Sequence, residues 1–186
     1  MDALFNVTSA FGLSASAGLN AYLPLLIVAV VNRYTDMVVL SKPWDVLSDA
    51  RVIAVLVVLL FIEILVDKIP AIDTVNDVVQ TIGRPTAGAI LFASNSGVIG
   101  DVNPVLACIA GLMVAGTVHG AKTVARPMIT ASTGGTGNWA ISLIEDSLAF
   151  IGTILAIVLP VVMGVFVLLF LGLFSFWFIR HRVQMA

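Results

Sequence analysis

The chain has 186 residues, of which 60% are hydrophobic and 11% are charged, with a formal net charge of −2. A soluble domain carries about 25% charged residues, so this composition excludes an ordinary soluble domain. The small net charge gives no reason to expect nucleic acid as a partner. Several apolar runs approach the roughly 20 residues that cross a bilayer as a helix, so the lipid bilayer is the expected surrounding.

The fold class expected from these runs is all-α, because segments with the alternating pattern of a membrane barrel are absent. We expect a polytopic transmembrane helical bundle of about six spans, with broken or re-entrant segments. Residues 1–186 are expected to form a single integral membrane domain.

The first apolar segment, residues 3–32, is long for one span. Its small and polar residues between Ser14 and Asn20 predict a helix broken near Gly18, or a short helix leading into a span from about 19 to 32. A polar loop over 33–50 and a second span over 51–66 follow. Residues 71–83 have the pattern of an amphipathic helix with an acidic polar face, which we expect to face positive groups of the protein itself.

Arg84 and Pro85 are expected to begin a separate, short apolar segment over residues 86–100. At ~1.5 Å per residue it would reach roughly 22 Å, so it is read as a tilted span or a re-entrant piece. Further spans are predicted over 105–125, about 138–159 and 160–179, and the run 130–137 is read as a loop. In the span 105–125, small residues are expected to allow close helix contact, namely Gly111, Ala115 and Gly116.

Basic residues near span ends predict the orientation, since they favour the cytoplasmic side. We expect a multi-pass protein of the inner (plasma) membrane with both termini in the cytoplasm. That choice places most Lys and Arg residues inside, namely Lys68, Arg84, Lys122, Arg126, Arg180 and Arg182.

One helix face is expected to carry three cationic or hydrogen-bonding side chains. His119, Lys122 and Arg126 are spaced i, i+3, i+7 and therefore share a face. Such donors suit a phosphate or carboxylate, and Arg84 is expected to join them as a substrate-binding residue. The alternative is that the basic residues anchor the span at the interface, and that His119 bonds only to a neighbouring helix.

Carboxylates occur in three pairs, two of them at i, i+4. Each pair could hold a cation or share a proton, so we assign them to proton or cation coupling. The alternative is a structural network that balances the basic residues without any ligand. The six residues are Glu63, Asp67, Asp73, Asp77, Glu145 and Asp146.

A Gly-rich stretch from Ser132 to Asn138 precedes a predicted helix. Such loops can present backbone N–H groups to an anion, and Asn138 is a good N-cap, so Ser132 and Asn138 join the candidate substrate-binding residues. The stretch lacks the Lys of a nucleotide-binding P-loop, and a plain flexible connector is the alternative. Enzyme motifs are weak, so an enzyme is not the preferred prediction. No catalytic residue and no cofactor are assigned, and a metal site is left open.

Several of these motifs occur together in a known family. They are the run from Asp67 to Gly88, the face from His119 to Arg126, and the run from Ser132 to Asp146. In this combination the chain resembles small bacterial inner-membrane proteins that are filed as a domain of unknown function. The likeness covers residues 10–160, and residues 161–186 would be a last span with a short basic tail. The resemblance implies a polytopic inner-membrane protein and no activity.

The function predicted from these features is a transporter or flippase-like carrier for an anionic group, either a lipid phosphate or a small organic anion. Broken segments at Gly18 and Gly134 would supply movable backbone. The alternatives are an oligomeric ion channel, a non-catalytic scaffold, and a membrane-embedded lipid-phosphate hydrolase. The expected partners are the bilayer and an anionic lipid or small anion, and a homo-oligomer is left open.

Overall fold

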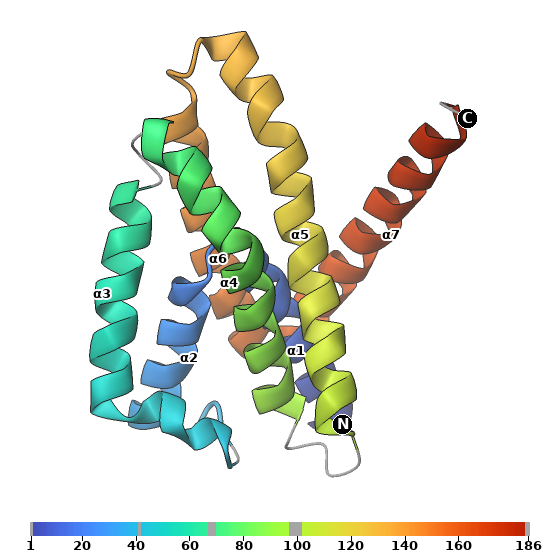
Figure 1. Ribbon diagram of the computed structural model, residues 1–186. Helices are drawn as coiled ribbons and strands as arrows, with labels where there is room; N and C mark the ends of the chain where they lie inside the picture. The colour runs from blue at the N-terminus through green and yellow to red at the C-terminus, as the bar shows by residue number, and fades with distance from the viewer. Residues whose placement is uncertain (1, 41, 67–69, 97–101, 185–186) are drawn as a thin grey trace.

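The computed structural model describes residues 2–40, 42–66, 70–96 and 102–184, with backbone alone for 2–3, 70–78, 96, 178–179 and 181–184. All regular elements in these residues are helices, which confirms the all-α fold class (Figure 1). They are α1 (Asp2–Leu19), α2 (Tyr22–Tyr34), the 3-10 turn η1 (Trp44–Ser48), α3 (Ala50–Val66), α4 (Pro70–Ser96), α5 (Pro104–Thr133), α6 (Asn138–Val158) and α7 (Pro160–Gln184).

Three helices in the described residues are long and apolar enough to cross a membrane. They are α5 with 30 residues, α6 with 21, and an 18-residue stretch of α7 that ends at Trp177. The helices α1 and α2 are apolar but shorter. At ~1.5 Å per residue the 13 residues of α2 extend about 20 Å, which is less than the ~30 Å hydrocarbon core.

The helices α1 and α2 form a hairpin rather than a lead-in helix and a span. Figure 1 shows that they meet inside the bundle and that α2 returns toward the end where α1 starts. The break expected near Gly18 is confirmed and lies at Asn20 and Ala21. It lies there because Asn20 Oδ1 accepts the backbone N–H groups of Tyr22 (3.2 Å) and Leu23 (2.9 Å) and so caps α2. Gly18 lies within α1, where a Cβ would come within 2.6 Å of the α5 backbone.

The start of α1 and the end of α7 lie at opposite ends of the bundle in Figure 1. The hairpin explains this arrangement, because α1 and α2 together return to the end of the bundle from which the chain sets out. The helices from α3 to α7 then run in alternating directions and end at the other side.

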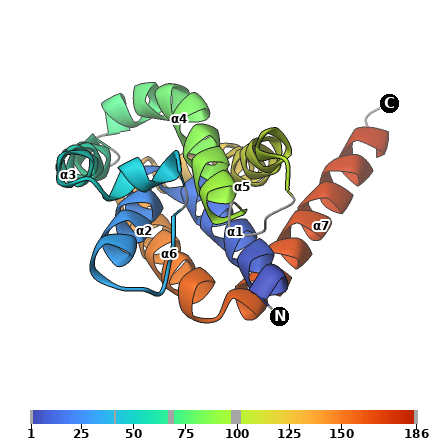
Figure 2. The same cartoon turned by 90° about the horizontal axis from the view of Figure 1, so that it is seen from below.

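Residues 70–96 form one helix, α4, so the expectation of an amphipathic helix followed by a separate apolar segment is wrong. Pro85 lies inside α4. A proline removes one backbone hydrogen bond and bends a helix without always ending it, and Figure 2 shows that α4 bends along its length. Arg84, next to the proline, is fully buried, so tertiary packing holds the chain helical at this point.

The helix α1 lies at the centre and packs against α4, α5, α6 and α7 (Figure 2). Where α4 crosses α5, a Cβ on Gly111 would overlap the carbonyl oxygen of Gly88. The prediction that Gly111 and Ala115 allow close contact is confirmed, because a Cβ on Gly88 would also overlap Ala115 Cβ. Gly116 is different: a Cβ there would have its nearest neighbour at 3.9 Å. The buried Ser14 hydroxyl donates to Gly88 O at 2.8 Å and ties α1 to this crossing.

Candidate functional site

A buried ion pair joins α3 to α4 beside the break between α1 and α2. Arg84 Nη2 lies 3.3 Å from Glu63 Oε1, and both side chains are 0% exposed. The backbone N–H of Ala21 donates to the same oxygen at 3.4 Å. Glu63 therefore faces a guanidinium and the positive N-terminal end of α2 together, which suits a carboxylate held away from water.

His119 of α5 is attached to the same pair. Its Nδ1 lies 3.3 Å from Arg84 Nη1, and its Nε2 lies 3.2 Å from Thr81 Oγ1. An arginine can only donate hydrogen bonds, so Nδ1 must accept. The imidazole is therefore neutral in this arrangement, with its hydrogen on Nε2, and it donates to Thr81. The side chains of Glu63, Arg84, His119 and Thr81 thus form one connected chain across α3, α4 and α5.

A second cluster joins α5 to α6 and brings two cations onto one oxygen. Lys122 Nζ lies 3.0 Å and Arg126 Nη2 lies 2.7 Å from Glu145 Oε2, and all three residues are buried. Glu145 stands seven residues, or about 10 Å, into α6 from its first residue. Two converging donors of this kind are the arrangement that recognises an oxygen of a phosphate or carboxylate. We call Lys122, Arg126 and Glu145 the anion cluster.

The break between α1 and α2 is tied to α6 by Asn20, which the sequence analysis did not select as a site residue. Asn20 Nδ2 donates to Asp146 Oδ1 at 2.9 Å. Since Glu63 accepts from Ala21, carboxylates from α3 and α6 hold the two residues of the break. The available signal was an amide in the interior of an apolar run, two residues after Gly18.

The Gly-rich stretch is placed differently from the expectation. The helix α5 continues to Thr133, and the loop is limited to residues 134–137, because Gly134 adopts a left-handed φ of 59° that ends the helix. Ser132 lies in the last turn of α5, is exposed, and donates to Ile129 O at 3.0 Å. In the described contacts, no hydrogen bond connects Ser132 to the anion cluster.

Asn138 is the first residue of α6 rather than its N-cap, a position that Gly137 occupies. Asn138 Oδ1 accepts from Thr130 Oγ1 at 2.9 Å. This bond closes the turn between α5 and α6. Asn138 thus braces the end of the hairpin that carries the anion cluster, and its side chain bonds to Thr130 rather than to Lys122 or Arg126 in the described contacts.

Comparison with known proteins identifies the family. Residues 7–180 match the sequence family described as Domain of unknown function (DUF4126). The chain belongs to this family. The match extends beyond the resemblance over residues 10–160 and includes most of α7. Neither the curated proteins nor the solved structures gave a match.

Three of the carboxylates chosen from the sequence of this DUF4126 chain lie outside the described part. They are Asp67 and the side chains of Asp73 and Asp77. The structure places the remaining charged candidates in two clusters, with Asp146 bonded to Asn20. The first cluster contains Glu63, Arg84 and His119, and the second contains Lys122, Arg126 and Glu145. In the described residues, no group of three or more His, Cys, Asp or Glu side chains could hold a metal ion.

Ser142 is a second residue that sequence reasoning did not select. It lies on α6 one turn before Glu145 and Asp146, and its side chain is 0% exposed. Its hydroxyl has no hydrogen-bond partner in the described part of the chain. A serine in an apolar helix usually bonds to the carbonyl four residues earlier, so its sequence position alone does not mark it.

Proposed function

We propose that this DUF4126 protein is a membrane carrier for an anionic group, either a lipid phosphate or a small organic anion. The observation that supports it is the anion cluster, in which Lys122 and Arg126 both contact Glu145 Oε2 inside the bundle. An anionic oxygen of the substrate would take the place of this carboxylate oxygen. Charged residues placed within a membrane protein are expensive and usually serve a pathway or a site.

The break between α1 and α2 supplies the movable element in this proposal. Transporters place helix breaks beside their sites, where backbone ends can rearrange. Glu145 and Asp146 are consecutive in α6, and Asp146 holds Asn20 at the break. A movement of Glu145 when the substrate binds would therefore also move Asp146 and, through it, Asn20 at the break. We assign the exchange role to Glu145 and the proton or cation coupling to Asp146.

The pair of Glu63 and Arg84 favours a second candidate, a non-catalytic scaffold. Both side chains are fully buried and contact each other, as expected of charges that only hold helices together. In the carrier proposal this pair and His119 keep that structural role, and the anion cluster performs the exchange. A scaffold predicts no exchange of any anion.

The proposed site of action is the inner (plasma) membrane. The end of the bundle that contains the loop between α5 and α6 would face the cytoplasm. Lys122, Arg126 and Arg180 lie toward this end of their helices, and basic residues favour the cytoplasmic side.

Exchange in liposomes tests the proposal. Purified protein in phosphatidylcholine vesicles loaded with phosphate or succinate is given radiolabelled phosphate, glycerol phosphate or succinate. We expect exchange of at least one anion, abolished by Arg126→Gln and preserved by Arg180→Gln, which removes an exposed cation on α7. Folded protein that exchanges none of the three would exclude a carrier of these small anions and leave the lipid phosphate and the scaffold. Wild-type exchange by Arg126→Gln would overturn the proposal.

A further inference from the structure

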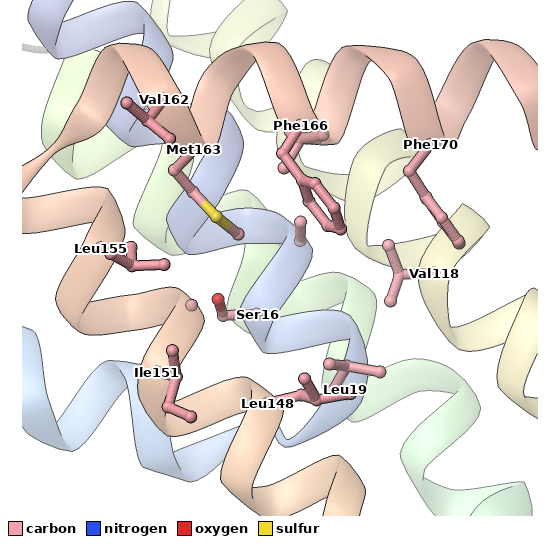
Figure 3. Close-up of a pocket in the computed structure, with 13 residues that line it drawn as sticks. Ser16, Leu19, Val118, Leu148, Ile151, Leu155, Val162, Met163, Phe166 and Phe170 are labelled. Atoms are coloured by element: carbon pink, nitrogen blue, oxygen red, sulfur yellow. The ribbon is translucent and has the colours of Figure 1, made fainter.

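A cavity of about 420 Å³ lies between α1, α5, α6 and α7. Figure 3 shows Met163 and Phe166 of α7 pointing toward α1, with Ile151 and Leu155 of α6 on the adjacent wall. Ligand sites in proteins commonly measure ~300–1,000 Å³, so the space is large enough for part of a small molecule. We call this cavity the apolar groove.

The apolar groove offers almost nothing to a polar solute. Of the 13 residues that line it, Ser16 is the one with a polar side chain. Ser16 Oγ donates to Gly12 O at 3.0 Å within its own helix, so this hydroxyl is already engaged. The other lining side chains are aliphatic, aromatic or Met, together with a glycine. The chemistry that fits this space is a hydrocarbon chain.

The groove lies about one helical turn from the anion cluster along two helices. Val118 lines the groove and stands four residues before Lys122 on α5. Leu148 lines the groove and stands three residues after Glu145 on α6. At ~1.5 Å per residue these steps are about 6 Å and about 4.5 Å, roughly one helical turn each. An apolar space and two cations therefore adjoin one another, which is the arrangement that an anionic amphiphile requires.

The size and opening of the groove favour a single chain over a partner helix. One turn of an α-helix, about 10 Å wide with a pitch of 5.4 Å, fills about 420 Å³. The groove could therefore take a single turn of such a helix, which is too little for a stable helix contact. Figures 1 and 2 show α7 diverging from the rest of the bundle, so a flexible chain could enter from the side.

We infer that the site takes an anionic lipid, with one hydrocarbon chain in the apolar groove and the charged headgroup at Lys122 and Arg126. The headgroup oxygen replaces Glu145 Oε2 between these two cations. The inference rests on the proposed function for the headgroup contacts and specifies its substrate class: the carried anion is an amphiphile, and its headgroup is a phosphate or a carboxylate.

Binding measurements with matched probes test the two halves of the site. The purified chain in a neutral maltoside detergent is titrated with dodecyl phosphate, dodecanoate, dodecanol and inorganic phosphate, and the midpoint of thermal unfolding is followed. We expect dodecyl phosphate or dodecanoate to bind more than tenfold tighter than inorganic phosphate, a gain that burial of about two methylene groups already gives. Dodecanol, which has the chain but lacks the charge, is expected to produce a much smaller shift than dodecyl phosphate. The stronger of the two anionic probes identifies the headgroup.

Two variants control for simple partitioning of the probes into detergent. Leu148→Trp fills the groove, whereas Leu143→Trp alters a similarly exposed leucine of α6 that does not line it. We expect Leu148→Trp to weaken the binding of dodecyl phosphate at least tenfold. Leu143→Trp should leave this binding unchanged. Equal behaviour of the two variants would overturn the inference. A wild-type chain that is a dimer in this detergent and a Leu148→Trp variant that is a monomer would also overturn it, because the groove would then be a contact between copies.

The outcomes separate this inference from the carrier proposal. If inorganic phosphate binds as tightly as dodecyl phosphate, the lipid inference is rejected and the anion carrier remains. If no anionic probe raises the midpoint of thermal unfolding, both the lipid inference and the carrier proposal are rejected. Equal shifts with dodecanol and dodecyl phosphate would reject the headgroup contact that both proposals require.

Discussion

Arg84 and His119 contact each other side chain to side chain, with 3.3 Å between Nη1 of the guanidinium and Nδ1 of the imidazole. Because the guanidinium can only donate, this contact requires a ring nitrogen without hydrogen. The other ring nitrogen then donates to Thr81 Oγ1 at 3.2 Å. The histidine is therefore a neutral connector between α4 and α5 in this arrangement.

Replacing His119 tests this assignment. His119→Gln keeps a neutral side chain that can accept a hydrogen bond from Arg84, so we expect the free energy of unfolding to fall by only about 1 kcal/mol. His119→Lys places a second buried cation beside Arg84, and we expect a loss of roughly 3 kcal/mol or more in the free energy of unfolding. Chemical unfolding of the two purified variants in the same detergent measures the difference. Equal stability of the two would show that the ring is not held as an acceptor.

The crossing of α4 and α5 gives a prediction about packing. Gly111→Ala adds a methyl group that would overlap the carbonyl oxygen of Gly88, and we expect a loss of about 1–3 kcal/mol. Gly120→Ala lies on the same helix with nothing within 4 Å of the added Cβ. It should therefore be neutral or stabilise by about 1 kcal/mol through helix propensity. Thermal unfolding midpoints of the pair provide the measurement, and a neutral Gly111→Ala would contradict the close crossing.

The predicted helix boundaries were accurate where one apolar run forms one helix. The segments expected over 51–66 and 138–159 appear as the helices Ala50–Val66 and Asn138–Val158, of which the second is long and apolar enough to cross a membrane. The prediction was wrong at Pro85, because proline has a strong local preference against a helix interior. Packing overrides that preference, since the buried Arg84 fixes the adjacent backbone in α4. Local sequence cannot contain this information.

The hairpin of α1 and α2 shows a second limit of sequence reasoning. A run of apolar residues has the same composition in one span and in two shorter helices. Contacts with α3 and α6 stabilise the turn, and they come from Glu63 and Asp146, far along the chain from Asn20.

The candidate site was predictable in part. Helical spacing placed Lys122 and Arg126 on one face, and both contact the same oxygen of Glu145. The choice of partner was not predictable, because several acids and bases could pair in many combinations. Ser132 was misplaced for a different reason: its Ser/Thr/Gly surroundings suggested a loop, whereas it lies in the last turn of α5.

Asn20 gives a prediction about the break. Asn20→Asp retains the oxygen that caps Tyr22 and Leu23 but replaces the donor to Asp146 with a second carboxylate oxygen. We expect the free energy of unfolding to fall by about 1–3 kcal/mol. Amide hydrogen exchange in residues 17–25 should become faster. The double variant Asn20→Asp with Asp146→Asn restores one donor and one acceptor. It should recover most of the loss, and failure to do so would place Asp146 outside the break.

A substitution of Glu145 is expected to affect anion binding and anion transport in opposite directions. Glu145→Gln removes the charge that competes for Lys122 and Arg126, so we expect an anion to bind at least tenfold tighter. Exchange across liposomes should fall at least tenfold, since release requires the carboxylate to return. The conservative control is Glu145→Asp, which keeps the charge on a shorter side chain and should retain part of the exchange. Unchanged anion binding in Glu145→Gln would remove Glu145 from the exchange step.

The bond between Asn20 and Asp146 has a consequence for the folding of the chain during its synthesis. These residues are 126 positions apart, so at ~5–20 residues per second the ribosome delivers the second roughly 6–25 s after the first. During this interval the nascent N-terminal hairpin lacks its aspartate partner. Its contact with α6 is therefore a late step of biogenesis, and a chain interrupted before α6 would hold this hairpin only through its contacts with α3, α4 and α5.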